Sequence, residues 1–278
     1  MAAEQSLVEL VRDSKNKAVV NLFGATLQSW IHDGTEMIFM SKGCVFDNKK
    51  PIMGGIPVVF PKFGSWDMGR PFHGFARINH WQFNEPAVKD HNGNITGTFT
   101  FTDTEETRTM WDNNRFKVIL TVTLTAESLF TGLSVLNLND TTSFDFTILL
   151  HTYIYLPDVT KITISGLNSV IYRDHTDDRK EKLETADKKS IHGHIDNVYV
   201  AAKNDHVITN VAGNKTLCLK KTNLPDTVIW NPWTNAKIYD FADNEQSNMI
   251  CIEAGYVVNP YTLLPGKEFV CAQHLLIA

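Results

Sequence analysis

The chain has 278 residues and a mass of 31.4 kDa, and its 26 basic and 31 acidic residues give a formal charge of −5. This mild acidity leaves no basic footprint for nucleic acid or an anionic membrane, and a hydrophobic fraction of 43% excludes a disordered chain. Apolar runs stay below the ~18 residues that span a bilayer. We therefore expect no nucleic-acid partner and no membrane partner.

The cysteines and the N-terminus indicate a compartment. The four cysteines, at positions 44, 218, 251 and 271, form no Cys-x-x-Cys pair, which is typical of free thiols in a reducing compartment. The first residues lack the basic and apolar regions of a secretory signal. No linker, repeat or charge block divides the chain. We expect a cytoplasmic protein with one domain over residues 1–278, and a monomer because no exposed apolar stripe is evident.

The N-terminal region combines one helical signal with a hairpin signal. Residues 6–12 have apolar spacing that predicts one or two helical turns, with Ser6 as a possible cap. Asp33-Gly34 then separates two apolar segments, residues 27–31 and 37–40. Asp-Gly favours the positive φ angles of a type I′ turn, so these segments are predicted to form a β-hairpin.

Alternation with period two dominates the middle of the chain. Residues 95–102, 116–124 and 144–150 each place apolar side chains at every second position, as half-buried strands do. Turn sequences at 91–94 and 139–142 separate them. Residues 174–190 are too polar for a core helix and predict a long exposed loop. The fold expected is all-β, a large antiparallel β-sandwich with few short helices.

Two glycine-containing segments break the alternation. Residues 50–64 contain three prolines and three glycines, which predicts a rigid, irregular backbone lying close to another part of the molecule, either as a structural corner or as part of a site. In residues 73–77, His73 and Arg77 flank a glycine. They could bind a sugar hydroxyl or an anion, or form an ordinary surface loop.

Two ionisable residues lie in strongly apolar strands. His151 follows Leu149-Leu150, and Glu253 shares one strand face with Cys251. A histidine there is either a hydrogen-bonded core residue or a proton-transfer group. A carboxylate there is either a salt-bridged structural residue or a base whose pKa is raised by its surroundings. Trp230 and Trp233 could stack on a sugar ring or simply pack.

Other functional motifs are missing from the sequence. It has no nucleotide-binding glycine fingerprint, P-loop or Gly-x-Ser-x-Gly elbow. His192 and His194 lie on one side of an extended segment, but no third ligand has a recognisable spacing. We therefore expect no metal and no cofactor.

Taken together, several segments resemble the D-hexose-6-phosphate mutarotases, or glucose-6-phosphate 1-epimerases, of the aldose 1-epimerase and galactose mutarotase-like superfamily. The resemblance runs from about residue 15 to the C-terminus. Its motifs, in chain order, cover residues 54–64, 73–77 with Trp81, 150–153, Asp196 to Tyr199, 230–233 with Asp240-Phe241, 253–255 and 264–266.

The resemblance implies an isomerase that interconverts the α and β anomers of a hexose 6-phosphate, most simply glucose 6-phosphate, without cofactor or metal. It implies a large antiparallel β-sandwich. Glu253 matches the family's general base and His151 its general acid. Arg77 matches an arginine that contacts phosphate, Asp196 an aspartate that binds sugar hydroxyls, and His73 a motif position near the sugar.

The sequence departs from the family pattern at two substrate-binding positions. Met53 occupies the place of a phosphate-binding arginine, and Phe72 the place of a frequent glutamine. We expect Lys62 or Arg70 to compensate, because Arg77 and both catalytic positions are present. The alternatives are an epimerase for free aldoses or another phosphosugar, and a catalytically silent carbohydrate-binding protein on the same fold.

Overall fold

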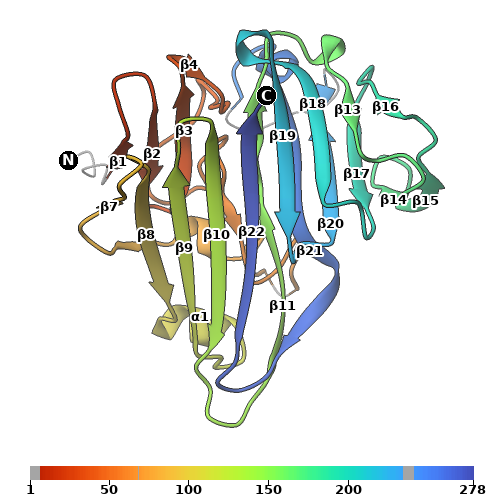
Figure 1. Cartoon of the computed structure of the whole chain (residues 1–278). Coiled ribbons are helices and arrows are strands. Elements are labelled where there is room, and N and C mark those ends of the chain that lie inside the picture. The colour runs from red at the N-terminus through yellow and green to blue at the C-terminus, as the bar shows by residue number, and fades with distance from the viewer. Residues whose placement is uncertain (1–6, 68, 234–240) are drawn as a thin grey trace.

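The computed structural model describes residues 7–67, 69–233 and 241–278. Ser6 and Asp240 lie outside the described residues. The strands form three sheets, and every pair of neighbouring strands within them is antiparallel (Figure 1). The structure thus has the predicted all-β fold. No helix in the described part is long and apolar enough to cross a membrane.

The first sheet lies at the N-terminal side of the molecule (Figure 1). Its first strand corrects the helix predicted over residues 6–12, because this segment pairs with the next strand in antiparallel register. Its β-branched valines favour an extended backbone, and Leu10 is buried in the core. The strands of this sheet are β1 (Leu7–Val11), β2 (Lys17–Asn21), β3 (Thr26–His32) and β4 (Thr35–Glu36).

The predicted Asp-Gly hairpin is confirmed. Asp33 and Gly34 have φ angles of 46° and 75° between β3 and β4. A type I′ turn requires positive φ at both central residues, and this conformation matches the twist of the two strands.

The second sheet has ten strands, and its long central strands cross the front of the molecule in Figure 1. The period-two prediction is confirmed at residues 116–124, where the side chains alternate between buried and half-buried. In spatial order the strands are β16 (Lys188–Lys189), β13 (Ile164–Ser165), β18 (Asp205–Val211), β19 (Lys215–Thr222), β22 (Glu268–Ile277), β10 (Ser128–Asn137), β9 (Phe116–Leu124), β8 (Ile95–Thr102) and β6 (Gln82–Phe83), with β7 (Val88–Lys89) paired to β8.

The third sheet has eight strands and lies behind the second in Figure 1. Its longest strand has 15 residues and pairs with three others, so it forms the centre of the sheet. In spatial order the strands are β15 (Lys180–Leu183), β14 (Ile171–Asp174), β17 (Ile195–Tyr199), β20 (Asp226–Asn231), β21 (Met249–Leu263), β11 (Phe144–Leu150) and β5 (Val58–Val59), with β12 (Tyr153–Tyr155) paired to β21.

The two large sheets share one apolar core. Phe146 of β11 and Phe269 of β22 meet edge to face with ring centroids 5.4 Å apart, and the connected cluster of buried side chains extends from Leu10 to Leu275. Buried polar bonds also cross between the sheets. The Thr152 hydroxyl donates to Oε1 of Gln273 at 3.0 Å, which fixes the chain beside His151 against β22.

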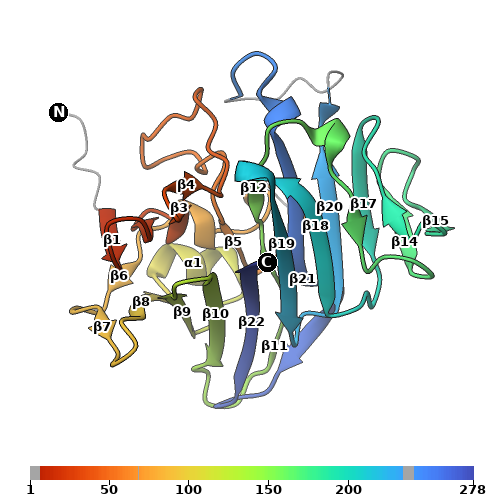
Figure 2. The same cartoon turned by 45° about the horizontal axis from the view of Figure 1, so that its top comes forward.

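The helices are short and lie outside the sheets. Figure 2 shows α1 beside the ends of β8 and β9. The Thr104 side chain accepts the Thr107 N–H and so caps this helix. The helical elements are α1 (Glu105–Met110) and the 3₁₀ turns η1 (Ala76–Ile78), η2 (Val159–Lys161), η3 (Ala212–Asn214) and η5 (Glu245–Asn248).

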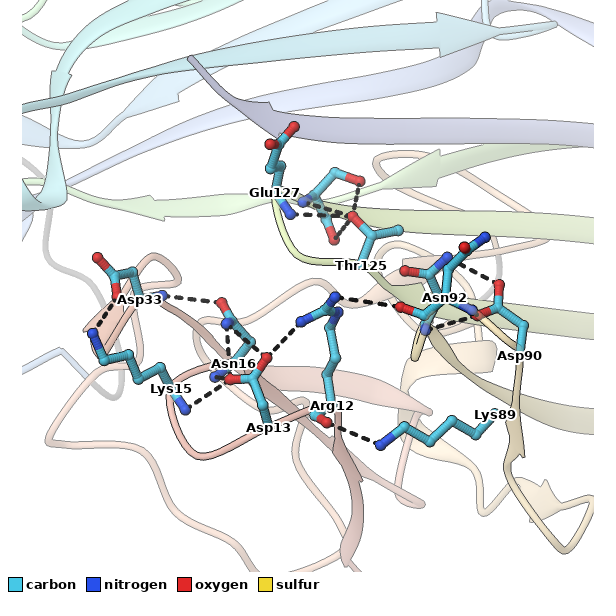
Figure 3. A network of polar contacts seen from close by, with 12 residues as sticks. Arg12, Asp13, Lys15, Asn16, Asp33, Lys89, Asp90, Asn92, Thr125 and Glu127 are labelled. Carbon is cyan, nitrogen blue, oxygen red and sulfur yellow. Dashed lines mark hydrogen bonds and ion pairs between the residues drawn. The ribbon is translucent and has the colours of Figure 1, made fainter.

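A polar network ties the N-terminal sheet to the second sheet (Figure 3). Lys89 Nζ donates to the Arg12 carbonyl at 3.0 Å, and Arg12 Nη2 donates to the Asn92 carbonyl at 3.4 Å. Asp13 accepts the Arg12 guanidinium at 2.6 Å. These bonds join the β1–β2 turn to the β7–β8 turn, which was predicted at residues 91–94.

The segment 174–190 differs from the long loop predicted for it. It contains β15 and β16, and β14 and β15 form a hairpin at the edge of the third sheet (Figure 2). Most of its side chains are exposed, as expected. The pairing escaped prediction because β15 has no alternation of apolar and polar residues for a sequence pattern to detect.

Candidate active site

Successive side chains of β21 point alternately to the two faces of the third sheet. Ile250, Ile252 and Ala254 belong to the main core, whereas Met249, Cys251 and Glu253 point to the opposite face and are also buried. The predicted common face of Glu253 and Cys251 is therefore present. It carries the candidate site on the side of the third sheet that faces away from the second sheet.

The strand register aligns polar and aromatic side chains across this face. Asp196 of β17 pairs with Trp230 of β20, which pairs with Cys251 of β21, and Cys251 pairs with Tyr153 of β12. Residues far apart in sequence thus form one row. Glu253 lies two positions from Cys251 along β21, opposite Val228.

A break between β11 and β12 positions His151. The His151 N–H donates to the Pro57 carbonyl at 3.0 Å rather than to the neighbouring strand β21, and the Thr152 carbonyl accepts the Ile252 N–H at 3.1 Å. The chain leaves the regular ladder here, as it does at a bulge, and a bulge re-aims the local side chain. His151 is thereby held over the face that carries Glu253.

The predicted rigid segment packs its backbone against β3 and against the chain that follows β4. A Cβ atom on Gly54 would lie 2.6 Å from the Phe39 carbonyl oxygen, and one on Gly55 would lie 2.5 Å from that of Leu27. Only glycine fits so close an approach. This segment and residues 63–77 form the second wall of the site.

This second wall and the face of the third sheet that carries Glu253 enclose a cavity of about 440 Å³. This volume is within the range of small-molecule sites. Histidine, arginine, carboxylate and aromatic side chains surround it, so it combines proton-transfer groups with surfaces suited to a sugar. The lining residues are Met53, Phe63, Gly64, Ser65, Phe72, His73, Arg77, His151, Tyr153, His175, Arg179, Asp196, Val228, Trp230 and Glu253.

His151 and Glu253 face each other inside the cavity. Nδ1 of His151 lies 3.4 Å from Oε1 of Glu253. The Tyr153 ring stacks on the imidazole with centroids 4.7 Å apart and an interplanar angle of 12°. This stacking fixes the plane of the imidazole.

Burial controls the protonation of this pair. Burial, followed by the nearby positive charge of Arg77, lowers the pKa of His151 to about 3. Burial, followed by the negative charge of Asp196, raises the pKa of Glu253 well above its ordinary value. Both effects favour neutral side chains, because a charge is costly where water is excluded.

The buried site atoms include three without a hydrogen-bond partner among the described residues. They are Nδ1 of His151, Oε2 of Glu253 and Nε of Arg77. An unsatisfied buried polar atom costs ~1–3 kcal/mol. Their convergence at one cavity is typical of a site that keeps such atoms for a ligand.

Backbone conformation and hydrogen bonds fix His73 and Arg77. His73 has a φ of 64°, and its Nδ1 accepts the Gly64 N–H at 2.9 Å. Burial lowers its pKa well below the usual value. Arg77 lies in η1, where its Nη2 donates to the Phe72 carbonyl at 2.8 Å, and burial lowers its pKa to about 10.

Asp196 lines the cavity from β17. Its Oδ1 lies 3.4 Å from Nδ1 of His175. Burial raises the pKa of Asp196, while the positive charges of His175 and His194 act in the opposite direction. The carboxylate is thus available to accept hydrogen bonds at the cavity wall.

Met53 and Phe72 give the cavity two apolar surfaces. The Tyr153 hydroxyl donates to Sδ of Met53 at 3.4 Å, so the thioether occupies space beside the row of site residues. Phe72 is 55% exposed and packs on His73 with ring centroids 4.0 Å apart. An exposed aromatic ring beside a sugar-sized cavity is a surface on which a pyranose can pack.

The structure does not bring Lys62 or Arg70 into this cavity. Lys62 lines a separate hollow of about 130 Å³, whereas its neighbour Phe63 lines the cavity. The Arg70 guanidinium lies 5.0 Å from the centroid of Trp66 and 3.7 Å from a carboxylate oxygen of Asp112. The structure therefore does not support either residue as a replacement for the arginine missing at position 53.

Eight of the lining residues were not among the predicted site residues, and they include Tyr153, Trp230, His175 and Arg179. Tyr153 was quoted only as part of a motif, and for Trp230 stacking on a sugar and simple packing were both left open, because an aromatic residue in a strand gives no signal of its own role. His175 and Arg179 belong to the polar segment 174–190, where a functional side chain cannot be told from an exposed one.

His151, Cys251 and Glu253 also form a possible metal-donor set, since one donor atom from each lies within 4.8 Å of the others. A divalent cation there would require the Cys251 thiol to ionise, and burial raises the pKa of that thiol well above its usual value. It would also add to the charge of Arg77.

Comparisons with known proteins place this chain in a family. The model of the family described as Aldose 1-epimerase matches residues 6–275. Two relatives carry the name "Putative glucose-6-phosphate 1-epimerase". The one from Cenchrus ciliaris is 34% identical over 91% of this chain and 78% of its own length, and the one from Escherichia coli (strain K12) is 30% identical over 94% and 87%.

A solved structure with the same fold is the "putative mutarotase (YeaD)" from Salmonella typhimurium. It superposes with a TM-score of 0.88 at 26% identity and covers 98% of this chain and 90% of its own. The family match spans nearly the whole chain, from β1 into β22. The chain belongs to the aldose 1-epimerase family of isomerases.

Proposed function

We propose that this protein interconverts the α and β anomers of a hexose 6-phosphate, with glucose 6-phosphate as the first substrate to test. The family membership supports an isomerase acting at the anomeric carbon. The names of the relatives supply the phosphosugar as the substrate class. The observation that carries the proposal is the pairing of a buried imidazole and a buried carboxylate in a cavity of about 440 Å³.

The proposed reaction needs one base and one acid. Glu253 removes the proton from the C1 hydroxyl, the C1–O5 bond breaks as C1 becomes a carbonyl, and His151 delivers a proton to O5. Rotation about C1–C2 turns the other carbonyl face toward O5, and the proton transfers then run backward as the ring closes. Each positioned group contributes ~10²–10⁴-fold to the rate.

The geometry suits a cycle in which the pair keeps one exchangeable proton. The two side chains are 3.4 Å apart, so a proton can reside on either group without a change in net charge. Burial favours the state with a protonated carboxyl and a neutral imidazole. A carboxylate with a raised pKa is a stronger base once it ionises, which suits the weakly acidic C1 hydroxyl.

Other cavity residues have proposed binding roles. Asp196 accepts hydrogen bonds from sugar hydroxyls, and His73 donates from the ring nitrogen that is not bonded to Gly64. Arg77 contributes a fixed positive charge near Glu253 and Tyr153. Met53 and Phe72 supply apolar contact in place of polar substrate contacts.

Exchange NMR tests the proposal. Saturation transfer between the α and β signals of glucose 6-phosphate is expected to exceed the spontaneous rate in the presence of the protein. Glu253→Gln and His151→Asn are each expected to lose at least about 10²-fold of this enhancement. Glu181→Gln and His80→Asn change exposed residues that do not line the cavity, and both are expected to keep full activity. Full activity of Glu253→Gln would overturn the assignment.

Free aldoses are the second candidate substrates. The apolar side chains of Met53 and Phe72 favour this alternative, because they remove two polar contacts from the cavity. The same NMR experiment with glucose separates the candidates. A higher kcat/KM for glucose than for glucose 6-phosphate would favour the free sugar as substrate.

The cellular setting is part of the proposal. The described residues contain no disulfide among the four cysteines, and this supports a reducing, cytoplasmic compartment. The core that extends from Leu10 to Leu275 supports a single domain. We propose a monomer, which sedimentation measurements test directly.

A further inference from the structure

The cavity has a second arginine that the family resemblance did not predict. Arg77 is half-buried beside Glu253 and Tyr153 and is hydrogen-bonded to the Phe72 carbonyl. Arg179 lines the same cavity but is exposed. It comes from the turn between β14 and β15, at the edge of the third sheet opposite to β5.

The turn fixes the position of the Arg179 backbone. Asp178 and Arg179 have φ angles of 50° and 60°, and the Arg179 N–H donates to the Asp174 carbonyl at 2.8 Å. Lys182 binds both Asp174 and Asp177, at 2.8 and 2.9 Å. The chain thus holds this turn in one conformation by ion pairs that do not involve the Arg179 side chain.

The Arg179 guanidinium is unpaired despite its acidic neighbours. Lys180 and Lys182 occupy the carboxylates of Asp177 and Asp174. No hydrogen bond or ion pair joins the Arg179 side chain to any residue that the structure describes. Its five N–H donors are therefore available to a ligand in the cavity.

The charges that face Arg179 favour an anionic ligand group. Asp196 is the acidic cavity residue whose charge interacts with Arg179, and its Oδ1 lies 3.4 Å from Nδ1 of His175, so this carboxylate already has a neighbour other than Arg179. Met53 and Phe72 also line the cavity and offer no charge. A guanidinium binds a phosphate through two parallel N–H bonds.

We infer that Arg179 binds the phosphate of the substrate and is the residue that favours a phosphorylated over a free sugar. This inference rests on the proposed function, since it names the residue that selects the proposed substrate. It also explains how the protein can lack an arginine at position 53. Arg77, by contrast, is left to act beside the reacting carbon.

Equilibrium binding tests this inference without requiring turnover. Calorimetric titration with glucose 6-phosphate and with glucose is carried out on the wild type, Arg179→Ala and Arg179→Lys. Arg179→Ala is expected to weaken glucose 6-phosphate binding roughly 10- to 100-fold, while glucose binding changes less than about twofold. Arg179→Lys is expected to recover part of the loss, because lysine keeps the charge but not the planar pair of donors.

A matched control comes from the same hairpin. Arg173 is an arginine of β14 that pairs with Glu181 and does not line the cavity. Arg173→Ala is expected to bind both sugars as the wild type does. Equal binding of glucose 6-phosphate by Arg179→Ala and wild type would overturn the inference, as would an equal loss for both sugars.

The two proposals can fail separately. If the wild type binds glucose 6-phosphate but does not accelerate anomer exchange, the proposed function fails and the affinities still decide the role of Arg179. If the wild type binds neither sugar, both proposals are overturned. If exchange is fast and Arg179→Ala leaves the KM for glucose 6-phosphate unchanged, only the inference about Arg179 is wrong.

Discussion

His151 and Glu253 face each other with Nδ1 and Oε1 3.4 Å apart, and the two side chains are 9% and 1% exposed. At this distance a formal ion pair would be attractive, yet removing two charges from water costs more than their attraction returns unless other bonds support them. Neither Nδ1 of His151 nor Oε2 of Glu253 has such a bond among the residues described. The pair therefore stays close to neutral and shares one proton.

The titration of His151 is the first prediction. Because burial and Arg77 lower its pKa to about 3, the imidazole is expected to gain no proton between about pH 8 and pH 5, whereas a histidine in a peptide titrates near ~6.5. The NMR signal of its ring carbon is expected to stay constant across this range. The signal is assigned by its loss in His151→Asn. A titration midpoint between about 6 and 7 would contradict this account of the pair.

Glu253→Gln is predicted to stabilise the protein while abolishing activity. The raised pKa of Glu253 means that the folded state binds more protons than the unfolded state above the ordinary pKa of a glutamate. The stability that this group contributes is present at acid pH and is lost as pH rises toward the raised pKa. Glutamine is neutral at every pH, so the gain is expected to be about 1–2 kcal/mol at pH 8 and smaller at pH 5.

Urea unfolding at these two pH values measures the effect. The result also separates a catalytic from a structural role of Glu253. A glutamate that serves as one half of a structural ion pair would cost about 3–5 kcal/mol when removed, because its partner would remain buried and charged. A loss of that size would contradict the prediction.

Gly74→Ala is predicted to damage both stability and activity. Gly74 has a φ of 73°, and an added Cβ would lie 2.2 Å from the Phe60 carbonyl oxygen. That carbonyl also accepts the N–H groups of Phe75 and Ala76 at 3.1 Å, so it cannot move away freely. We expect the free energy of unfolding to fall by more than ~2 kcal/mol. We also expect a reduced kcat/KM, because a displaced backbone at residue 74 also displaces His73.

Gly34→Ala is the control for this substitution. Gly34 has a φ of 75°, but a Cβ added there would have no other heavy atom within 4 Å among the described residues beyond its chain neighbours. Its free energy of unfolding is expected to fall only by the ~1 kcal/mol that an alanine costs at a positive φ angle, and its activity is expected to be unchanged. Thermal unfolding of the two variants therefore separates backbone strain from the close approach to Phe60.

The parts of the fold that were predicted correctly are those in which a local sequence pattern determines the structure. Alternation located β9, because every second residue from Phe116 to Leu124 faces the same core. The turn at Asp33-Gly34 could be predicted because a type I′ turn requires positive φ angles, which these two residues adopt. The helix predicted over residues 6–12 was wrong, because pairing of β1 with β2 outweighs a weak helical spacing.

The candidate site could be predicted only where residues carried a motif. His151, Glu253, Arg77, Asp196, His73, Met53 and Phe72 all line one cavity, and their roles remain predictions. Lys62 was chosen by sequence proximity, which does not say on which side of the backbone its side chain lies. Arg179 could not be found, because its position depends on the hairpin that brings residue 179 to the cavity from the sheet edge.

Lys221 gives a final prediction, on the alkaline side of the stability curve. This lysine is 3% exposed, and its Nζ donates to the Pro225 and Asp226 carbonyls at 3.0 Å and to the Thr227 hydroxyl at 2.8 Å. Burial lowers its pKa to about 8 from 10.5, so between these values the unfolded state binds more protons than the folded state. Stability is therefore expected to rise with pH through this window, by about 3 kcal/mol from this group.

Lys221→Met removes that titration. The unfolding free energies of the wild type and Lys221→Met are measured in urea from about pH 7 to pH 10.5. As pH rises, the wild type is expected to gain stability relative to Lys221→Met. Ionisation of cysteines and tyrosines affects both proteins and cancels in the difference. Lys220→Met changes the exposed neighbour on β19 and is expected to give a flat difference. A flat difference for Lys221→Met as well would mean that the folded protein accommodates the charged ammonium at no cost, against the burial of this side chain.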